Sequence, residues 1–234
     1  MRSHLMKKPS QRCGENGNSM LEFALVMSVL VPLFAGMFTI GITLSKGIQV
    51  SNVCQDAVVL MVRANTDPDA GLDLSLTQNQ RIIVRAAAGL GMNSDAQYDP
   101  SSTGNAVVIL SKVVMVGPQE CSTGVIPAPP TAPPWTAQNC PNYGQYAFEY
   151  RVVIGNGSRW TSTFGNPPTG VVQSNGTISA KDIATNTSNR ALNATFLNLS
   201  PSTFALISEM YADVSYINLF SVMNTPIIYS RSIS

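Results

Sequence analysis

The chain has 234 residues, a formal net charge of +1 and only 12% charged side chains, whereas about a quarter is usual in soluble proteins. The near-neutral charge gives no sign of nucleic-acid binding. Its only histidine is His4, so a chain beginning at Asn18 would lack both histidine-dependent catalysis and histidine-ligated metals. We therefore expect no enzyme, no cofactor and no metal site. The length allows one ordinary domain, or a small domain with a membrane anchor.

An apolar run extends from Asn18 to Leu44 and contains one charged residue, Glu22. A helix of about 25 residues is ~37 Å long, enough to cross a bilayer core of ~30 Å. The preceding segment is basic, with Arg2, Lys7, Lys8 and Arg12 against Glu15. Positive charge before a span keeps that end in the cytoplasm, so we expect a single-pass inner-membrane protein with a periplasmic or extracellular C-terminal domain. The alternative is a cleaved secretory signal, but this run is longer than the usual ~7–15 residues and no A-x-A site follows it.

Glu22 is costly inside a membrane, by about 2.5–3.5 kcal/mol near the centre and less near the interface. It therefore needs a partner, unless it is an interfacial carboxylate that reaches the headgroups without further function. The block from Gly17 through Glu22 to Phe23 resembles the processing site of type IV pilin precursors. The longer string N-S-M-L-E-F-A-L-V, which begins at Asn18, resembles more narrowly the TadE-like minor pilins of tight-adherence (Tad/Flp) pili.

The resemblance implies a structural subunit, a minor pilin or pseudopilin, that serves a pilus with a role such as cell adhesion. A prepilin peptidase would cut after Gly17 and leave Asn18 as the new N-terminus. Glu22, followed by Phe23, would pair with the amine of a neighbouring subunit and direct assembly. The implied partners are other pilin subunits, the pilus assembly platform, the prepilin peptidase and membrane lipid. TadE-like proteins are often shorter, so the loops 117–142 and 155–203 resemble additions to a smaller core.

Helical periodicity continues beyond the apolar run. The apolar positions that recur at i, i+3, i+4 and i+7 are Val50, Val53, Cys54, Ala57, Val58 and Met61. We expect one helix from Asn18 to about Ala64, ending in the segment 65–68 because a residue before proline disfavours helix. A second helix is expected over 75–90. Its apolar side would hold Leu76, Ile83, Ala87 and Leu90.

From Asn105 the apolar period changes to two, which predicts strands at 107–116, 146–154, 206–216 and 227–233. Short gaps favour an antiparallel sheet, so the fold class is α+β, with a long N-terminal helix packed on the sheet. In the second strand, Ala147, Glu149 and Arg151 would form the less buried face. In the third, Glu209 and Asp213 would form a solvated face, roughly 13 Å apart at ~3.3 Å per residue. The two catalytic carboxylates of a glycosidase lie about 5–9.5 Å apart, so this pair is too widely separated for that chemistry.

Two cysteines flank a proline-rich loop. A disulfide between Cys121 and Cys140 would stabilise it by about 3 kcal/mol in an oxidising compartment, and the alternative is two free thiols. Cys54 would be a small buried apolar residue. Residues 155–203 read as irregular loops with a short hairpin at 175–176. N-x-Ser/Thr triplets begin at Asn156, Asn175, Asn186, Asn193 and Asn198; they arise by chance in such a composition, or mark glycosylation in a eukaryotic source.

These features divide the chain into a cytoplasmic leader (1–17), a transmembrane helix (18–44), a helical stalk with a second helix (45–104) and an exported sheet domain (105–234). The alternative to a pilus subunit is a single-span, membrane-anchored extracytoplasmic adhesin or binding domain in which Gly17 is not cut. A third alternative is an anchored hydrolase. The sequence does not support it, because it contains no phosphate loop, metal cluster or nucleophile elbow.

Overall fold

The computed structural model describes residues 15–66, 74, 76–92, 104–125, 135–214 and 227–234. The chain divides into two compact units, residues 1–42 and 43–234, and each is described by itself. Helix α1 (Glu15–Thr66) supplies the described part of the first unit and the start of the second. Pro32 lies inside this helix. A proline cannot donate to the carbonyl four residues earlier, so the carbonyl of Ser28 lacks its usual helical partner.

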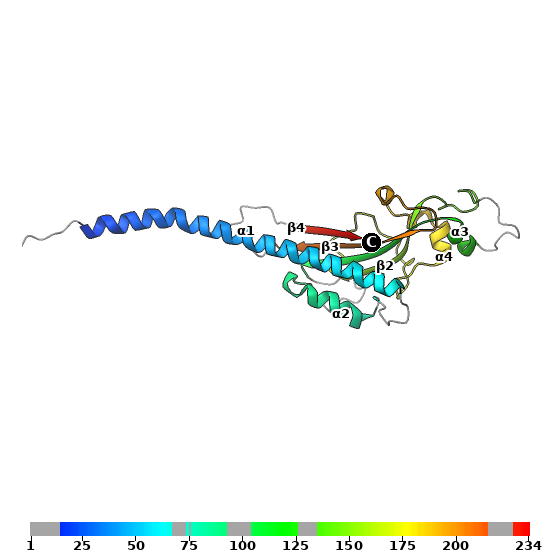
Figure 1. The fold of residues 1–234 in the computed structure, drawn as a ribbon, viewed down its shortest axis with the longest axis horizontal. Helices are drawn as coiled ribbons and strands as arrows, with labels where there is room; N and C mark the ends of the chain where they lie inside the picture. Colours follow the sequence, from blue (N-terminus) through cyan, green and yellow to red (C-terminus); the bar gives the residue numbers. More distant parts are fainter. Residues whose placement is uncertain (1–14, 67–73, 75, 93–103, 126–134, 215–226) are drawn as a thin grey trace, which may run out of the picture. The chain divides into compact units, whose positions relative to one another are not determined.

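The second unit is built on a four-stranded antiparallel sheet of order β2-β1-β3-β4 (Figure 1). Its strands are β1 (Ala106–Met115), β2 (Tyr146–Gly155), β3 (Phe204–Asp213) and β4 (Ile227–Ile233). All four lie where period-two alternation predicted strands. The α+β class, with a long helix on an antiparallel sheet, is confirmed. Tyr216, which we expected in the third strand, lies outside the described residues.

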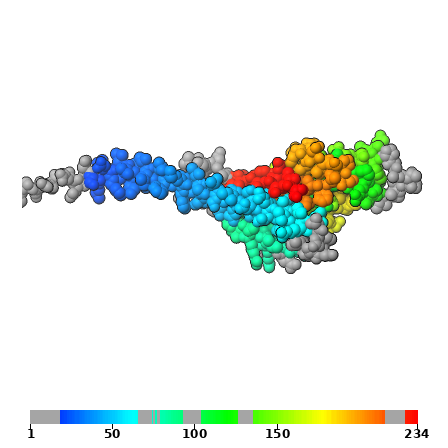
Figure 2. Space-filling model, in the orientation of Figure 1, coloured from blue at the N-terminus to red at the C-terminus, as the bar shows by residue number. Residues whose placement is uncertain are grey.

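The stalk, which we define as residues 45–66 of α1, packs on one face of the sheet (Figure 1). The six apolar positions identified from helical spacing are all buried there. Cys54 is among them, and its Sγ donates to the carbonyl oxygen of Ser208 at 3.1 Å. Figure 2 shows the cyan stalk and red β4 as neighbouring surfaces, and Cys54 also lies 3.5 Å from the carbonyl oxygen of Ser230. Helix α1 ends at Thr66, inside the predicted stop segment.

Helix α2 (Thr77–Ala86) and the short helix η2 (Ala88–Leu90) lie beside the stalk, where the second helix was expected. Ile83, Ala87 and Leu90 are buried, as their spacing predicted. Leu76 is 43% exposed, so its assignment to the buried side was wrong. The reason is its place just before the helix, where it has extended backbone and is the N-cap of α2 rather than part of its apolar stripe.

The segment between β2 and β3 forms a second layer. Its residues Trp160 and Phe164 pack on the face of the sheet opposite the stalk, whereas Ile178 and Ile183 lie beside Met61 at the end of the stalk. The layer contains α4 (Ala180–Thr185), η3 (Thr187–Asn189) and η4 (Thr195–Leu197), and it contributes Phe164, Ile178 and Ile183 to a second core. The hairpin expected at 175–176 is present: Val172 bridges Ile178, and Gly176 takes the positive φ of +82° that such a turn needs. The expectation of irregular loops therefore missed a covering layer.

This second layer overturns four predictions about exposure. One is that of Ala147, which was expected on the less buried face of the second strand and is 0% exposed. Arg151, Glu209 and Asp213 are 3%, 0% and 3% exposed, whereas the alternating pattern placed them on the less buried or solvated faces. The alternating pattern predicts that polar strand residues face water. Here, side chains from the second layer cover them and supply their hydrogen-bond partners, so both faces of the sheet are packed.

Candidate functional site

The first unit exposes an unusually apolar surface. Large apolar side chains along it are largely uncovered, including Met20 (78%), Phe23 (62%) and Phe38 (63%). Among the described residues, one helix, Ser19–Asn65, is long and apolar enough to cross a membrane by length and composition. A hydrocarbon environment would cover these side chains, whereas water would not. The helix therefore has the character of a single-pass membrane anchor.

The four residues assigned to processing and assembly lie together at the start of α1. Gly17 and Asn18 belong to its first turns, and Glu22 follows Asn18 by four residues, about one helical turn. Glu22 and Phe23 are both exposed. Within the described residues, Glu22 makes no ion pair. The Glu22 carboxylate thus lies on the apolar surface of helix α1, where a cation from another molecule could pair with it.

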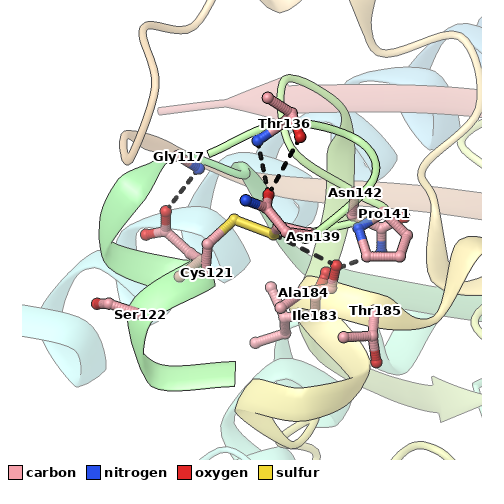
Figure 3. Close-up of a disulfide and its surroundings, with 12 residues drawn as sticks. Gly117, Cys121, Ser122, Thr136, Asn139, Pro141, Asn142, Ile183, Ala184 and Thr185 are labelled. Atoms are coloured by element: carbon pink, nitrogen blue, oxygen red, sulfur yellow. Dashed lines mark hydrogen bonds between the residues drawn. A yellow bond between two sulfur atoms is a disulfide. The ribbon is translucent and has the colours of Figure 1, made fainter. Parts of the chain in front are cut away.

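A disulfide lies at the end of the second unit where α3 (Pro118–Gly124) meets the segment after residue 134 (Figure 3). It joins Cys121 to Cys140, whose Cα atoms are 5.8 Å apart. The segment expected as an irregular loop is thus partly helical, because Pro118 and Glu120 provide a helix start: the Glu120 side chain accepts from the N–H of Gly117 at 2.8 Å. The prolines at 127, 129, 130, 133 and 134 lie outside the described residues.

Asn142 extends this cross-link to the second layer. Its Nδ2 donates to the carbonyl oxygen of Ile183 at 2.8 Å (Figure 3). The same nitrogen donates to the carbonyl oxygen of Asn186 at 2.9 Å, and the two bonds hold the end of α4. The Asn142 Oδ1 accepts from Arg190 Nε at 2.9 Å. A single buried amide therefore connects three segments beside the disulfide, and it uses both its donors and its acceptor.

A cavity of about 650 Å³ opens between the end of the stalk, the sheet and the second layer. Its apolar lining includes Met61, Leu74, Ile178, Ile183 and Leu206, and its polar lining includes Lys112, Glu120 and Glu149. The Lys112 and Glu149 side chains form an ion pair at 2.9 Å. The lining is therefore mixed, with charged, amide and hydroxyl groups beside apolar side chains, and it would suit a small ligand or side chain that has both polar and apolar parts. Nothing in the linear sequence marked this cavity, because its lining comes from seven separate segments.

Glu209 is the centre of a buried polar cluster on the other face of the sheet. Its Oε1 accepts from the backbone N–H of Thr163 at 3.0 Å, from Thr163 Oγ1 at 2.5 Å and from the hydroxyl of Tyr229 at 3.1 Å. Its Oε2 accepts from the hydroxyl of Ser162. Burial raises the pKa of Tyr211 and Tyr229, and the neighbouring carboxylate of Glu209 raises both further. The carboxylate is surrounded by fixed donors, which is the arrangement of a structural anchor.

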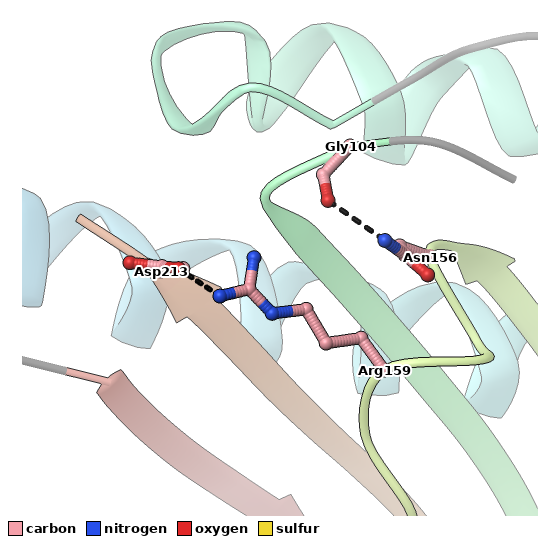
Figure 4. Close-up of polar contacts among 4 residues, drawn as sticks. All are labelled: Gly104, Asn156, Arg159 and Asp213. Carbon is pink, nitrogen blue, oxygen red and sulfur yellow. Dashed lines mark hydrogen bonds and ion pairs between the residues drawn. The ribbon is translucent and has the colours of Figure 1, made fainter. Parts of the chain in front are cut away.

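The other predicted strand carboxylate, Asp213, pairs with Arg159 (Figure 4). Nearby, Asn156 Nδ2 donates to the carbonyl oxygen of Gly104 at 2.9 Å. Both contacts attach the segment after β2 to the end of the sheet where β1 begins and β3 ends. Within the described ranges, no group of three or more metal-ligating side chains is present.

The fold and the N-terminal segment together define a class: a membrane-anchored α+β protein whose apolar helix continues as a stalk packed on an antiparallel sheet. The model of the TadE-like protein family matches residues 17–58 of this chain. The matched segment covers Gly17, Glu22 and the first part of the stalk, so the chain is TadE-like in this region and is related to the proteins of Tad pili. No curated protein and no solved structure matches the chain.

Proposed function

We propose that this protein is a structural subunit, a minor pilin or pseudopilin, of a bacterial Tad-type pilus. The observation that carries the proposal is the placement of Glu22 five residues after Gly17, at the start of an exposed apolar helix and inside the TadE-like match. In this reading a prepilin peptidase removes the leader 1–17, and residues 18–44 hold the subunit in the inner membrane. Residues 45–104 form the stalk region, and residues 105–234 form the exported domain.

The chemistry of the new terminus explains why a carboxylate is retained there. Cutting after Gly17 converts the Asn18 nitrogen into an α-amine, which is a cation when it is protonated. A cation and a carboxylate that are both surrounded by hydrocarbon attract strongly, whereas either one alone is costly. Pairing Glu22 with the amine of a neighbouring Asn18 would therefore draw two helices together and fix their axial register.

The experiment is intact-mass measurement and N-terminal sequencing of the full chain expressed with and without an active prepilin peptidase. We expect a peptidase-dependent start at Asn18 that Gly17→Trp abolishes. Gly14→Trp is the matched control, since it places the same bulky residue three positions earlier and should leave cleavage intact. A chain that still starts at Met1 beside an active peptidase would contradict the proposal. A start near residues 36–45 would instead identify a cleaved secretory signal.

The second candidate is a single-span anchored adhesin or binding domain, with the pilus machinery uninvolved. The cavity of about 650 Å³ beside the Lys112–Glu149 ion pair favours it. The two candidates differ in the peptidase experiment, because an anchored binding domain keeps residues 1–17. An adhesin role for a processed subunit would combine both readings.

A further inference from the structure

We propose that the elbow formed by the end of α2 and by η2, residues 85–91, lies in the phospholipid headgroup layer beside the point where the anchor leaves the membrane. Arg85 would face the lipid phosphates. This inference rests on the membrane anchor in the proposed function, but not on leader cleavage or pilus assembly.

Two hydrogen bonds place the elbow next to the end of the span. Lys46 Nζ donates to the carbonyl oxygen of Gly89 at 2.5 Å, and Gln49 Nε2 donates to the carbonyl oxygen of Ala86 at 3.2 Å. The apolar run ends at Leu44, so these two donors are the second and fifth residues beyond it. Their partners, Gly89 and Ala86, come about 40 residues later in the chain. The two hydrogen bonds nevertheless hold these partners beside the first residues of α1 after the apolar run.

The dimensions of a bilayer put this level in the headgroups. At ~1.5 Å per residue, Lys46 lies about 3 Å and Gln49 about 7.5 Å beyond Leu44 along the helix axis. A hydrocarbon core of ~30 Å inside a bilayer of ~40–45 Å leaves about 5–7 Å of headgroup region on each side. Because Gly89 and Ala86 are bonded directly to these residues, chain continuity alone keeps the elbow near this layer.

The elbow is held rigidly and presents a defined outer side. Ala87 and Leu90 are 0% and 1% exposed, which fixes the inner side against the core. Gly91, at a φ of +68°, accepts from the backbone N–H of Asn105 at 2.9 Å, which ties the elbow to the start of β1. The outer side carries Arg85 and Ala88, both exposed.

The charge of the outer side matches phosphate. Arg81 and Arg85 are four residues apart on α2, and both are exposed. Like charges at this spacing repel each other and weaken a helix in water. A row of lipid phosphates removes that repulsion, and the planar guanidinium group binds phosphate through paired hydrogen bonds.

The test uses the full chain in lipid nanodiscs that contain phosphatidylglycerol, in a Cys13→Ser, Cys54→Ala background. A nitroxide is attached through Ala88→Cys on the elbow, Phe38→Cys in the span, or Ser188→Cys on the exposed surface of η3. Its accessibility to oxygen and to a water-soluble nickel chelate reports depth. We expect the label at 38 in hydrocarbon, the label at 188 in water and the label at 88 at headgroup depth.

The outcomes separate the elbow from the anchor. A label at 88 as accessible to nickel as the label at 188, with the label at 38 buried, would overturn the inference and leave the anchor intact. A water-exposed label at 38 would instead refute the anchor. The role of Arg85 is tested by Arg85→Glu, which should raise nickel accessibility at position 88. Arg63→Glu, the same change on an exposed arginine at the far end of the stalk, should not; equal effects would overturn the role of Arg85.

Discussion

Glu209 and Thr163 are 46 residues apart in the chain, and the Thr163 backbone N–H lies 3.0 Å from the Glu209 carboxylate, which also accepts from the Thr163 hydroxyl at 2.5 Å. Glu209 is completely buried on β3. One side chain thereby fastens the second layer to the sheet. Through the Tyr229 hydroxyl it also fastens the edge strand β4.

Removing this carboxylate should destabilise the second unit strongly. Glu209→Ala leaves the Thr163 N–H and the Ser162 and Tyr229 hydroxyls without their acceptor, and we expect a loss of about 3 kcal/mol or more. Glu209→Gln keeps one acceptor oxygen and the shape of the side chain, so it should cost less than half as much. Urea unfolding of the full chain in detergent measures both. Equal losses for the two variants would show that the cluster contributes through packing alone.

Alkaline pH should destabilise the protein through Tyr211 and Tyr229. Their pKa values are raised above the ordinary value of 10.0, so above about pH 10 the unfolded chain releases tyrosine protons that the native chain retains. The stabilisation is therefore complete below pH 10 and is lost as the pH rises towards the native pKa values. Unfolding midpoints should change little through these tyrosines between about pH 8 and pH 10 and should fall above pH 10, and Tyr211→Phe should flatten that fall. An unchanged slope in Tyr211→Phe would contradict this assignment.

Two glycines with similar backbone angles should differ in their tolerance of alanine. Gly155 and Gly170 have φ values of +95° and +85°. A Cβ at Gly155 would lie 2.4 Å from the carbonyl oxygen of Ala106, whereas nothing lies within 4 Å at Gly170. Gly170→Ala should cost about 1–2 kcal/mol from backbone strain alone, and Gly155→Ala should cost clearly more because strand β1 must shift. Thermal unfolding of the two variants in parallel provides the comparison, and equal costs would be inconsistent with the close approach.

The disulfide between Cys121 and Cys140 should contribute about 3 kcal/mol, since it closes a loop with a sequence separation of 19. The double variant Cys121→Ser, Cys140→Ser should lose that stability, and wild-type protein treated with a reductant should match it. Mass measurement after alkylation confirms the redox state in each sample. If the reduced wild type unfolds at the same denaturant concentration as the oxidised protein, the bond does not stabilise the fold.

Glu22→Ala should separate processing from assembly. Under the proposed function a prepilin peptidase would recognise the junction at Gly17, so the variant should still be cut, while the loss of the carboxylate should prevent its recovery in sheared surface filaments. Ser28→Ala is the control: it changes one small polar side chain of the same helix, whose hydroxyl donates to the carbonyl oxygen of Leu25 within that helix. Filament incorporation of Glu22→Ala at the wild-type level would contradict the proposed role of Glu22.

The polar residues of the strands show where local reasoning failed. Alternation identified β3 correctly, yet it placed Glu209 and Asp213 in water. Both are buried because the segment after β2 returns across the sheet and supplies Thr163 to Glu209 and Arg159 to Asp213. A period-two pattern records which side chains are polar. It cannot record whether a distant segment will satisfy them, since that depends on contacts between residues far apart in the chain.

The sequence by itself determined the apolar span, the buried face of the stalk, the positions of the four strands and the TadE-like block at Gly17–Phe23. Each of these depends on side chains separated by only a few residues, which helical and strand geometry place on a common face. Only the tertiary structure decided the strand order β2-β1-β3-β4, the burial of Glu209 and the contact of Lys46 with Gly89. The contacts of Lys46 with Gly89 and of Glu209 with Thr163 join residues 43 and 46 positions apart in the chain. The packing of the whole unit selects them, because no local pattern favours one such pairing over another.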